Sequence, residues 1–485
     1  MNVPTHPASL PADSAPLDAR LSAALPHTAD FSLAVPNDLR LGLARAWLWL
    51  ALASLIGSGV MSILLVLSRT PYLQKIFPLV DFFRVALVVH VDLSVLVWFI
   101  AFAGVLWSLN GGKRFILLAW SGWVASTAGA AAMTLAPFLG SGGPIMSNYV
   151  PVLEDPIFMS GLAFFGIGFT LLVLRSLLTA PKAGLRPDGG AALAFGLNAA
   201  SVSAAVALFA LLWSLMKVPM ALEGKAYYEM LFWGSGHVIQ FTYTLLMLVA
   251  WLWLANACGA RIPLTPRIAL LLFAIGLASV FVVPPIYLAH DVTSVEHRQL
   301  LTWLMRFGGG LPILPMGLAV VIGLVRAGRP GRLAPAQRPL HAALVSSLVL
   351  FAVGGLIGFL IQGSNVKIPA HYHGCIVGVT LALMGLAYHL LPRLGYAQPA
   401  SRLATWQPYL YGFGQLLHIA GLVWSGGYGV QRKVAGSEQV LRSTQEIVGM
   451  GIMGLGGLIA IIGGLIFLVV MLRAMMHCDA GTARR

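Results

Sequence analysis

The chain has 485 residues, of which 58% are hydrophobic and only 9% are charged, and its mean hydropathy is +0.85. These values exclude an ordinary water-soluble protein and indicate a polytopic membrane protein. The formal net charge of +14 then indicates basic cytoplasmic loops, and a nucleic-acid partner is not expected.

Residues 1–38 are rich in Pro, Ala and Asp and carry no apolar run behind a basic start. We expect a disordered cytoplasmic tail there, and not a signal peptide. Apolar runs of membrane-spanning length follow at 43–67, 85–109, 115–138, 157–179, 191–216, 228–257, 266–289, 299–325, 341–362, 370–392, 407–427 and 445–472. They predict an all-α integral membrane fold, a twelve-transmembrane-helix bundle over residues 39–475, and residues 476–485 form a cytoplasmic C-terminal tail.

The charge distribution predicts the orientation of the bundle. With the N terminus in the cytoplasm, most Lys and Arg residues fall on the inside, whereas the acids gather in outer loops and outer helix ends. We therefore expect a multi-pass protein of the bacterial inner membrane with both termini cytoplasmic. No Asp, Glu or Lys falls in the cytoplasmic half of a predicted span, so protons for buried chemistry are expected from the outer face; Ser, Thr and Tyr side chains with water are the alternative route.

Histidines recur at one depth, toward the outer side, on four predicted spans: His90, His237, His290, and the pair His371 and His373. Taken singly, each is better explained as a hydrogen-bonded packing residue. An ionisable residue inside a bilayer is costly, however, and the shared depth favours a redox metal site. Side chains at i and i+2 of a helix point about 200° apart, so the paired histidines can face two different cofactors.

Heme is the cofactor that this pattern fits. A bis-histidine heme carries electrons, whereas a mono-histidine heme keeps one position open for a gas, and the arrangement suits one of each. Cys258, Cys375 and Cys478 are far apart and form no CxxC or CxxCH pattern, so neither a disulfide framework nor a covalently attached heme is indicated. Electrons must then arrive from another subunit or a mobile donor.

The segment Pro369-Ala-His-Tyr-His-Gly, followed by ALMGLAYHLLPRLGY, resembles helix 10 of heme-copper oxidase and nitric oxide reductase catalytic subunits (subunit I). The resemblance extends over essentially the whole chain and is closest to a divergent nitric oxide reductase group. It implies that His90 and His373 are the axial ligands of a low-spin heme and that His371 is the axial ligand of a high-spin heme, both b-type and on the periplasmic side. It also implies that His237, in WGSGHVIQF, is the first ligand of a non-heme metal.

The family's next metal-binding element is an adjacent histidine pair, where this chain has His290 and Asp291. Because a carboxylate is a harder ligand than imidazole, a metal site of His237, His290 and Asp291 suits iron better than copper. Asp291 resembles the substitution in some divergent nitric oxide reductases. The alternatives are that Asp291 is an interfacial helix cap and that His297 completes the site.

Four residues after the helix 6 histidine, oxygen-reducing members usually carry a tyrosine and well-studied nitric oxide reductases a glutamate, but this chain has Phe241. Tyr243 and Tyr287 lie nearby, off that pattern, and are better explained by packing. Gln240 and Glu229 resemble the surroundings in less common reductase groups. With Asp291, these two are the candidate catalytic residues; their alternative role is helix-end capping and interhelix bonding.

Arg432 and Lys433 follow predicted helix 11, where the family holds basic residues against heme propionates. Their alternative role is that of an ordinary flanking basic pair. His418 and His389 lie off the shared depth or pattern and are expected to be structural.

The resemblance implies a membrane-bound respiratory reductase whose low-spin heme feeds a high-spin heme and non-heme metal. The reaction it favours is 2 NO + 2 e⁻ + 2 H⁺ → N₂O + H₂O, without proton pumping. Reduction of O₂ to water by a terminal oxidase, a non-enzymatic heme-bearing sensor or assembly factor, and NO dismutation are the alternatives. The expected electron donor is a small membrane-anchored cupredoxin-like or cytochrome c subunit, or quinol.

Overall fold

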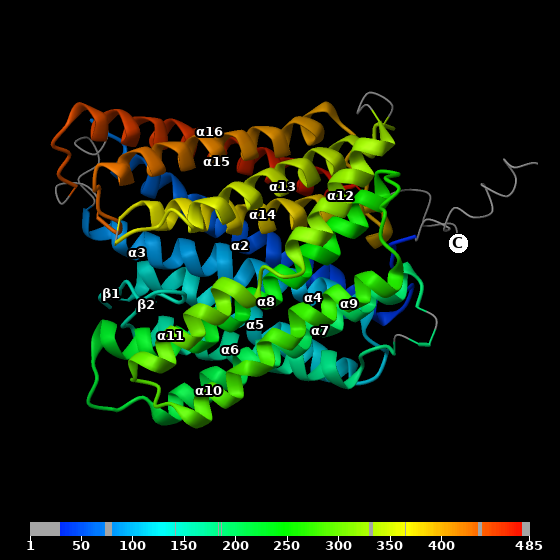
Figure 1. The fold of residues 1–485 in the computed structure, drawn as a ribbon, viewed down its shortest axis with the longest axis horizontal. Coiled ribbons are helices and arrows are strands. Elements are labelled where there is room, and N and C mark those ends of the chain that lie inside the picture. The colour runs from blue at the N-terminus through cyan, green and yellow to red at the C-terminus, as the bar shows by residue number, and fades with distance from the viewer. Residues whose placement is uncertain are drawn as a thin grey trace, which may run out of the picture.

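The computed structural model describes residues 30–72, 80–140, 142–182, 184–185, 187–328, 333–363, 365–434 and 439–477. The predicted tails, 1–38 and 476–485, therefore lie largely outside the described residues. In the described part, each of the twelve predicted spans is helical, and the helices run side by side along the long axis of the molecule (Figure 1).

Nine spans are single α-helices: α2 (Leu39–Arg69), α5 (Ile116–Leu139), α6 (Pro156–Leu178), α7 (Gly189–Lys217), α8 (Gly224–Ala257), α13 (Arg338–Gly358), α14 (Lys367–Leu390), α15 (Arg402–Gly427) and α16 (Thr444–Met476). Three spans are interrupted by a short π-helical or 3-10 segment. They are α3 (Val80–Val91), η2 (Asp92–Val97) and α4 (Trp98–Asn110); α9 (Pro266–Ala278), η3 (Ser279–Val282) and α10 (Val283–Ala289); and α11 (Val295–Trp303), η4 (Leu304–Gly308) and α12 (Ile313–Ala327).

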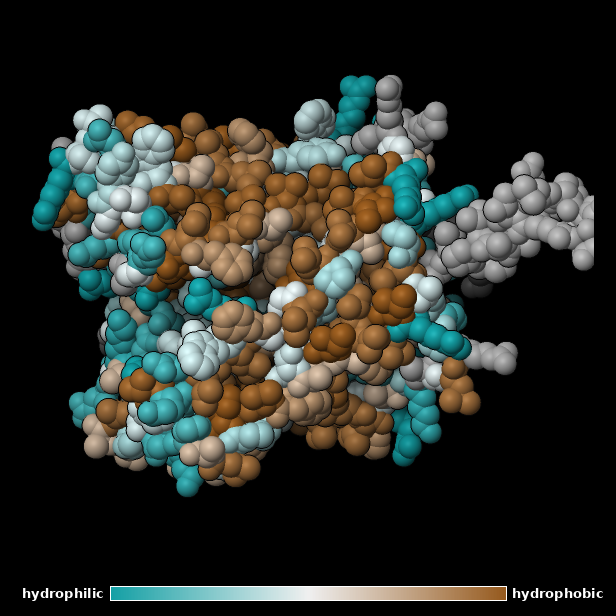
Figure 2. Space-filling model, in the orientation of Figure 1, coloured by the Kyte–Doolittle hydropathy of each residue, from teal (hydrophilic) through white to brown (hydrophobic). Residues whose placement is uncertain are grey.

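Eleven of these spans, among the residues described, are long and apolar enough to cross a membrane; α15 is the exception. It carries Gln407, Gln415 and His418, all buried, which lower its hydropathy. On the face drawn in Figure 2, brown apolar residues cover the middle of the molecule and polar residues gather at the two ends, as a bilayer requires.

Close glycine contacts join α15 to α16. A Cβ atom on Gly421 would lie 2.3 Å from the backbone nitrogen of Met453, and one on Gly456 would lie 2.2 Å from that of His418. Small residues let membrane helices approach closely, so this packing sets the position of His418 beside the core.

Between α5 and α6 the chain forms a small antiparallel hairpin, β1 (Pro144–Ile145) and β2 (Val152–Leu153). In Figure 1 it lies at the end of the bundle opposite the C terminus. The loop between its strands, residues 146–151, is called the hairpin loop.

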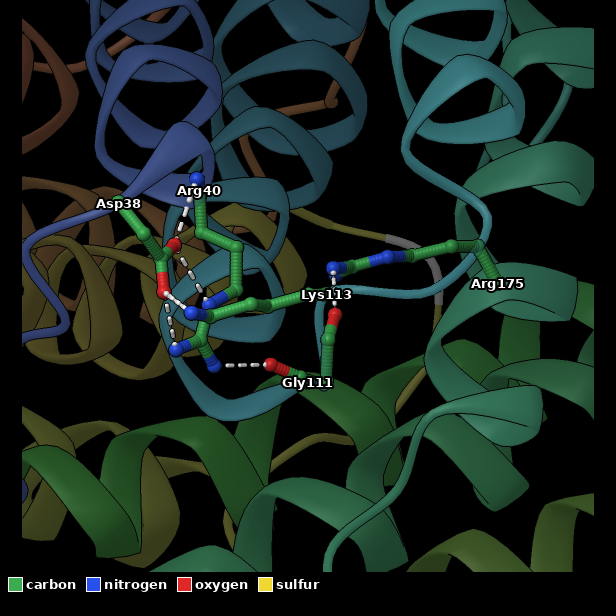
Figure 3. A network of polar contacts seen from close by, with 6 residues as sticks. Asp38, Arg40, Gly111, Lys113 and Arg175 are labelled. Atoms are coloured by element: carbon green, nitrogen blue, oxygen red, sulfur yellow. Dashed lines mark hydrogen bonds and ion pairs between the residues drawn. The ribbon is translucent and has the colours of Figure 1, made fainter.

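At the other end, a polar network ties α2 to the α4–α5 connection (Figure 3). Asp38 caps α2 and accepts hydrogen bonds from the side chain of Arg40, at 2.9 and 2.8 Å, and Arg40 donates to the carbonyl oxygen of Gly111 at 2.6 Å. The fully buried Arg175 of α6 donates to the carbonyl oxygens of Trp107 and Gly112, at the C-terminal end of α4. A cation is favourable there because the last carbonyls of a helix carry partial negative charge.

Candidate functional site

A cavity of about 1560 Å³ occupies the core of the bundle. His90 of α3, His237 of α8, and His371 and His373 of α14 all line it. Four of the five histidines that sequence reasoning placed at one depth therefore share one space.

Each of these four imidazoles is anchored through Nδ1 to an oxygen that accepts a hydrogen bond. The contacts are His90 Nδ1 to Ser58 O at 3.0 Å, His237 Nδ1 to Trp233 O at 2.7 Å, His371 Nδ1 to Gly354 O at 2.7 Å, and His373 Nδ1 to Gln415 Oε1 at 3.2 Å. Because these oxygens only accept, Nδ1 carries the proton and Nε2 keeps its lone pair. That tautomer is the one an iron ligand needs, and anchoring Nδ1 also fixes the orientation of the ring.

The cavity residues fit two hemes. Three histidines that present an Nε2 lone pair, His90, His371 and His373, line one large space whose walls are mainly aliphatic and aromatic. The ring of His418 lies 4.6 Å from that of His373, and its Nδ1 donates to the carbonyl oxygen of Met453 at 2.9 Å.

The three predicted non-heme metal ligands are not brought together. His237 lines the cavity, but His290 and Asp291 do not. Asp291 is exposed, and its Oδ1 accepts from the backbone nitrogen and the hydroxyl of Thr293 at 2.8 and 2.6 Å. These hydrogen bonds lower the pKa of Asp291. In the described part of the chain no group of three or more His, Cys, Asp or Glu is arranged to hold a metal ion, so the residues as placed do not form that site.

His297 is fully buried, and neither of its ring nitrogens has a hydrogen-bond partner among the described residues. It is close enough to His237, His290 and Asp291 to interact with each electrostatically. The edge of its ring packs on Tyr287, with 4.6 Å between the ring centroids.

Of the candidate residues around His237, some line the cavity and others do not. Gln240 lines the cavity, and its amide donates to the carbonyl oxygen of Gly236 at 3.2 Å. Phe241 is buried but lies outside the lining, whereas Tyr243 belongs to it. Tyr287 lies away from the cavity and shares a 2.9 Å hydrogen bond with Ser214.

The other three polar candidates converge on one residue of the hairpin loop, Asn148. Glu229 accepts from the backbone and side-chain nitrogens of Asn148 at 3.0 and 2.9 Å. From the other side, Lys433 and Arg432 donate to its Oδ1 at 3.3 and 3.5 Å, and Lys433 also donates to the carbonyl oxygen of Met146 at 2.6 Å. Burial, with the Arg432 charge second, lowers the pKa of Lys433 to about 8. Arg432 and Lys433 both line the cavity, but Glu229 does not.

Sequence reasoning missed two residues near these histidines. Asp92, two residues after His90, is 1% exposed, and neither carboxylate oxygen finds a partner within the described ranges. It begins η2, a π-helical turn of the kind often found at functional sites. Tyr149, next to Asn148, places its hydroxyl 2.9 Å from His237 Nε2. No periodic pattern marks a loop residue, so only the turn-forming residues around it gave any signal.

Twelve membrane helices around a cavity of Nδ1-anchored histidines define a class, the multi-pass membrane protein built to hold hemes between its helices. The model of the family "Cytochrome C and Quinol oxidase polypeptide I" matches residues 42–473, and the chain therefore belongs to this family, subunit I of the heme-copper oxidase superfamily. Members are membrane oxidoreductases that bind hemes and a binuclear metal centre.

The relatives include two uncharacterized proteins. RP382 of Rickettsia prowazekii (strain Madrid E) is 29% identical over 497 residues, covering 88% of this chain and 95% of that protein. A protein of Aquifex aeolicus (strain VF5) is 27% identical over 373 residues, covering 75% of this chain and 88% of its own. A solved structure described as a heme-copper terminal oxidase dimer is similar in fold, with a TM-score of 0.73 at 17% identity over 92% of this chain and 85% of that one.

Proposed function

We propose that this protein is the catalytic subunit of a membrane-bound respiratory reductase that converts NO to N₂O. The observation that carries the proposal is that Gln240 lines the cavity beside His237, one residue before the position that holds tyrosine or glutamate in the commoner relatives. Phe241 occupies that position and lacks the phenol hydroxyl that the usual oxygen reductases have there, which disfavours oxygen reduction.

The hemes, when bound, supply the electrons and the position at which a gas binds. In the proposal His90 and His373 hold the low-spin heme, His371 holds the high-spin heme, and Arg432 and Lys433 face the propionates. The Nδ1 hydrogen bonds of the three histidines raise the basicity of the imidazoles and hold each ring in one orientation. The cavity wall is mainly apolar, and polar interactions are stronger in such surroundings than in water.

Iron bound by His237, His290 and Asp291, with His297 as the alternative third ligand, stays a hypothesis about metal content. No catalytic step is assigned to it, because the described residues do not form such a site. Metal analysis of the purified protein and of Asp291→Ala and His297→Ala variants tests it: a non-heme metal lost in one variant only identifies the third ligand.

The first functional experiment is to reduce the purified complex without oxygen, add NO, and follow NO loss and N₂O formation together. We expect sustained turnover to N₂O in the wild type. Turnover lost in the Asp291→Ala variant supports an aspartate-bound metal. No NO consumption by a preparation with both hemes intact would overturn the proposal.

Oxygen reduction is the second candidate, because four tyrosines line the cavity: Tyr149, Tyr243, Tyr372 and Tyr411. Oxygen uptake with water as the product would favour it. A non-enzymatic heme-bearing sensor is the third, favoured by the dispersed metal ligands. Two hemes, no third metal and no turnover with either gas would support that alternative.

A further inference from the structure

We infer that Tyr149 belongs to the substrate site, where its hydroxyl donates a hydrogen bond to the diatomic molecule that is reduced in the cavity. The inference rests on the proposed function in one respect, that a diatomic gas enters this cavity. It assigns a catalytic role to a loop residue, in a protein whose helix α8 has Phe241 at the position of the usual polar group.

The direction of the hydrogen bond follows from the anchoring of His237. Its Nδ1 donates to Trp233 O at 2.7 Å, so its Nε2 can only accept, and the Tyr149 hydroxyl 2.9 Å away must be the donor. The side chain of Gln240 lies close to this hydroxyl. The O–H group is therefore aimed into the cavity wall at the point where His237 and Gln240 meet.

The backbone around Tyr149 is shaped for this placement. Tyr149 has φ of +67°, in the left-handed region that non-glycine residues seldom occupy and that costs about 1–3 kcal/mol in general. On α8, a Cβ atom at Gly236 would lie 2.2 Å from the ring of Tyr149, so only glycine leaves room for it. The ring also meets Trp233 edge-on, with 6.1 Å between centroids.

Asn148 holds the loop that carries Tyr149. Its backbone and amide nitrogens donate to Glu229 on α8, and its Oδ1 accepts from Lys433 and Arg432, which follow α15. The hydroxyl of Ser147 donates to the carbonyl oxygen of Val150 at 2.6 Å and closes the turn. Glu229, Arg432 and Lys433 thus act on the cavity through Asn148, as positioning residues for Tyr149.

A fixed O–H donor is useful in such a site because reduction places negative charge on the oxygen of the substrate. A preorganised donor in a water-excluded cavity stabilises that charge without reorganisation at the moment of reaction. Tyr149 keeps its proton in this role, so no bond to it is made or broken. In the structure this proton is donated to His237 Nε2, and rotation about the C–O bond lets the same hydroxyl donate to a molecule bound beside it in the cavity.

The test uses the holoenzyme, reduced without oxygen and exposed to carbon monoxide, and records the C–O stretching band by infrared spectroscopy in H₂O and in D₂O. A donor O–H that exchanges its proton makes the band shift between the two solvents. We expect the shift in the wild type and in Tyr243→Phe, the matched loss of another cavity hydroxyl, and its absence in Tyr149→Phe. Turnover by Tyr149→Phe is expected to fall about 100-fold in kcat with little change in KM, as for loss of one preorganised donor.

A solvent shift that persists in Tyr149→Phe would overturn the inference. If that variant does not assemble with heme, Asn148→Ala decides, because it keeps the hydroxyl and releases the loop: a weakened shift supports the inference, and an unchanged one contradicts it. A Tyr149-dependent shift without NO turnover would refute the proposed function alone, whereas NO turnover without the shift would refute the role of Tyr149 alone.

Discussion

The four cavity histidines are not all held through Nδ1 by the same kind of acceptor. His371 and His237 donate to backbone carbonyls, whereas His373 donates to the amide oxygen of Gln415 at 3.2 Å. A side-chain acceptor can be replaced without disturbing the backbone. Under the proposed assignment, the redox potential of the low-spin heme can therefore be tuned by a single substitution at Gln415.

Gln415 is expected to tune the low-spin heme. Gln415→Leu removes the acceptor, makes the His373 imidazole less basic and raises the reduction potential. Gln415→Glu provides a stronger acceptor and lowers the potential. Potentiometric titration of the purified protein measures both; shifts of the same sign in the two variants would contradict this role.

Heme content tests the assignment of the histidines. His90→Ala is expected to reduce the bound heme from two per chain to one, because it removes one axial ligand of a bis-histidine iron. His418→Ala is the control, because its ring packs on His373 but its Nδ1 is committed to the carbonyl oxygen of Met453. Pyridine hemochrome analysis gives the ratio, and loss of heme in His418→Ala would show that His418 does more than pack.

Sequence could identify the histidines but not their hydrogen bonds. The spacing of His371 and His373 predicted that they face different ways, and the shared depth singled out His90 and His237, whose roles the resemblance implied. The partners Ser58, Gly354 and Gln415 are ordinary helix residues in the sequence, and only the packing of α2, α13 and α15 against the histidine helices selects them. Tyr149 was not predicted as a site residue for the same reason, because contact between a loop and α8 leaves no periodic pattern in the sequence.

At the scale of the elements, the apolar runs predicted all twelve spans, because a bilayer allows only continuous hydrogen-bonded helices to cross it. What the runs could not show is where a helix changes its winding. The π-helical turns η2 and η4 and the 3-10 turn η3 interrupt spans that read as uniform in hydropathy. The hairpin was also unpredicted, since two paired residues on each strand are too few to give an alternating pattern.

Asp38 is expected to stabilise the start of α2. Asp38→Ala removes the helix cap and should cost about 1 kcal/mol, seen as a lower melting temperature of the detergent-solubilised protein. Asp38→Asn keeps a capping side chain and loses the ion pair with Arg40, so its melting temperature is expected to fall between those of the wild type and Asp38→Ala.

The pH dependence of this contribution has a definite sign. The Arg40 side chain holds the pKa of Asp38 well below its ordinary value of 3.8. A lowered carboxyl pKa stabilises the fold above the unfolded value, and the effect is lost only as the pH falls through the folded value. The difference in melting temperature between wild type and Asp38→Asn is therefore expected to be the same at about pH 7 and about pH 5. A difference that vanishes at the lower pH would contradict the ion pair.

On the face drawn in Figure 2, an apolar belt separates the two polar ends of the molecule. The end with the Asp38 and Arg175 network is the predicted cytoplasmic side, and the end with the hairpin is the predicted outer side (Figures 1 and 3). Sequence predicted this division from basic loops alone. The cavity shape and the separation of Asp291 from His237 could not be predicted, because they depend on how α10 and α11 pack on α8.

Single cysteines test the orientation. Leu185, 98% exposed between α6 and α7, and Met220, 87% exposed between α7 and α8, lie in neighbouring connections at opposite ends of α7. In intact cells a membrane-impermeant thiol reagent is expected to label Met220→Cys and to spare Leu185→Cys. Cell lysis makes the second accessible, and labelling of Leu185→Cys before lysis would reverse the orientation.

Asn148 has a consequence for the order of events during synthesis. Its partners lie far along the chain, Glu229 at a separation of 81 residues and Lys433 at 285. The ribosome must therefore complete all but the last helix before Asn148 can form its hydrogen bond with Lys433. Contacts between residues so far apart in the chain form late in folding. Until then the loop that carries Tyr149 lacks its contact with Lys433, and we expect heme insertion to precede the formation of that contact.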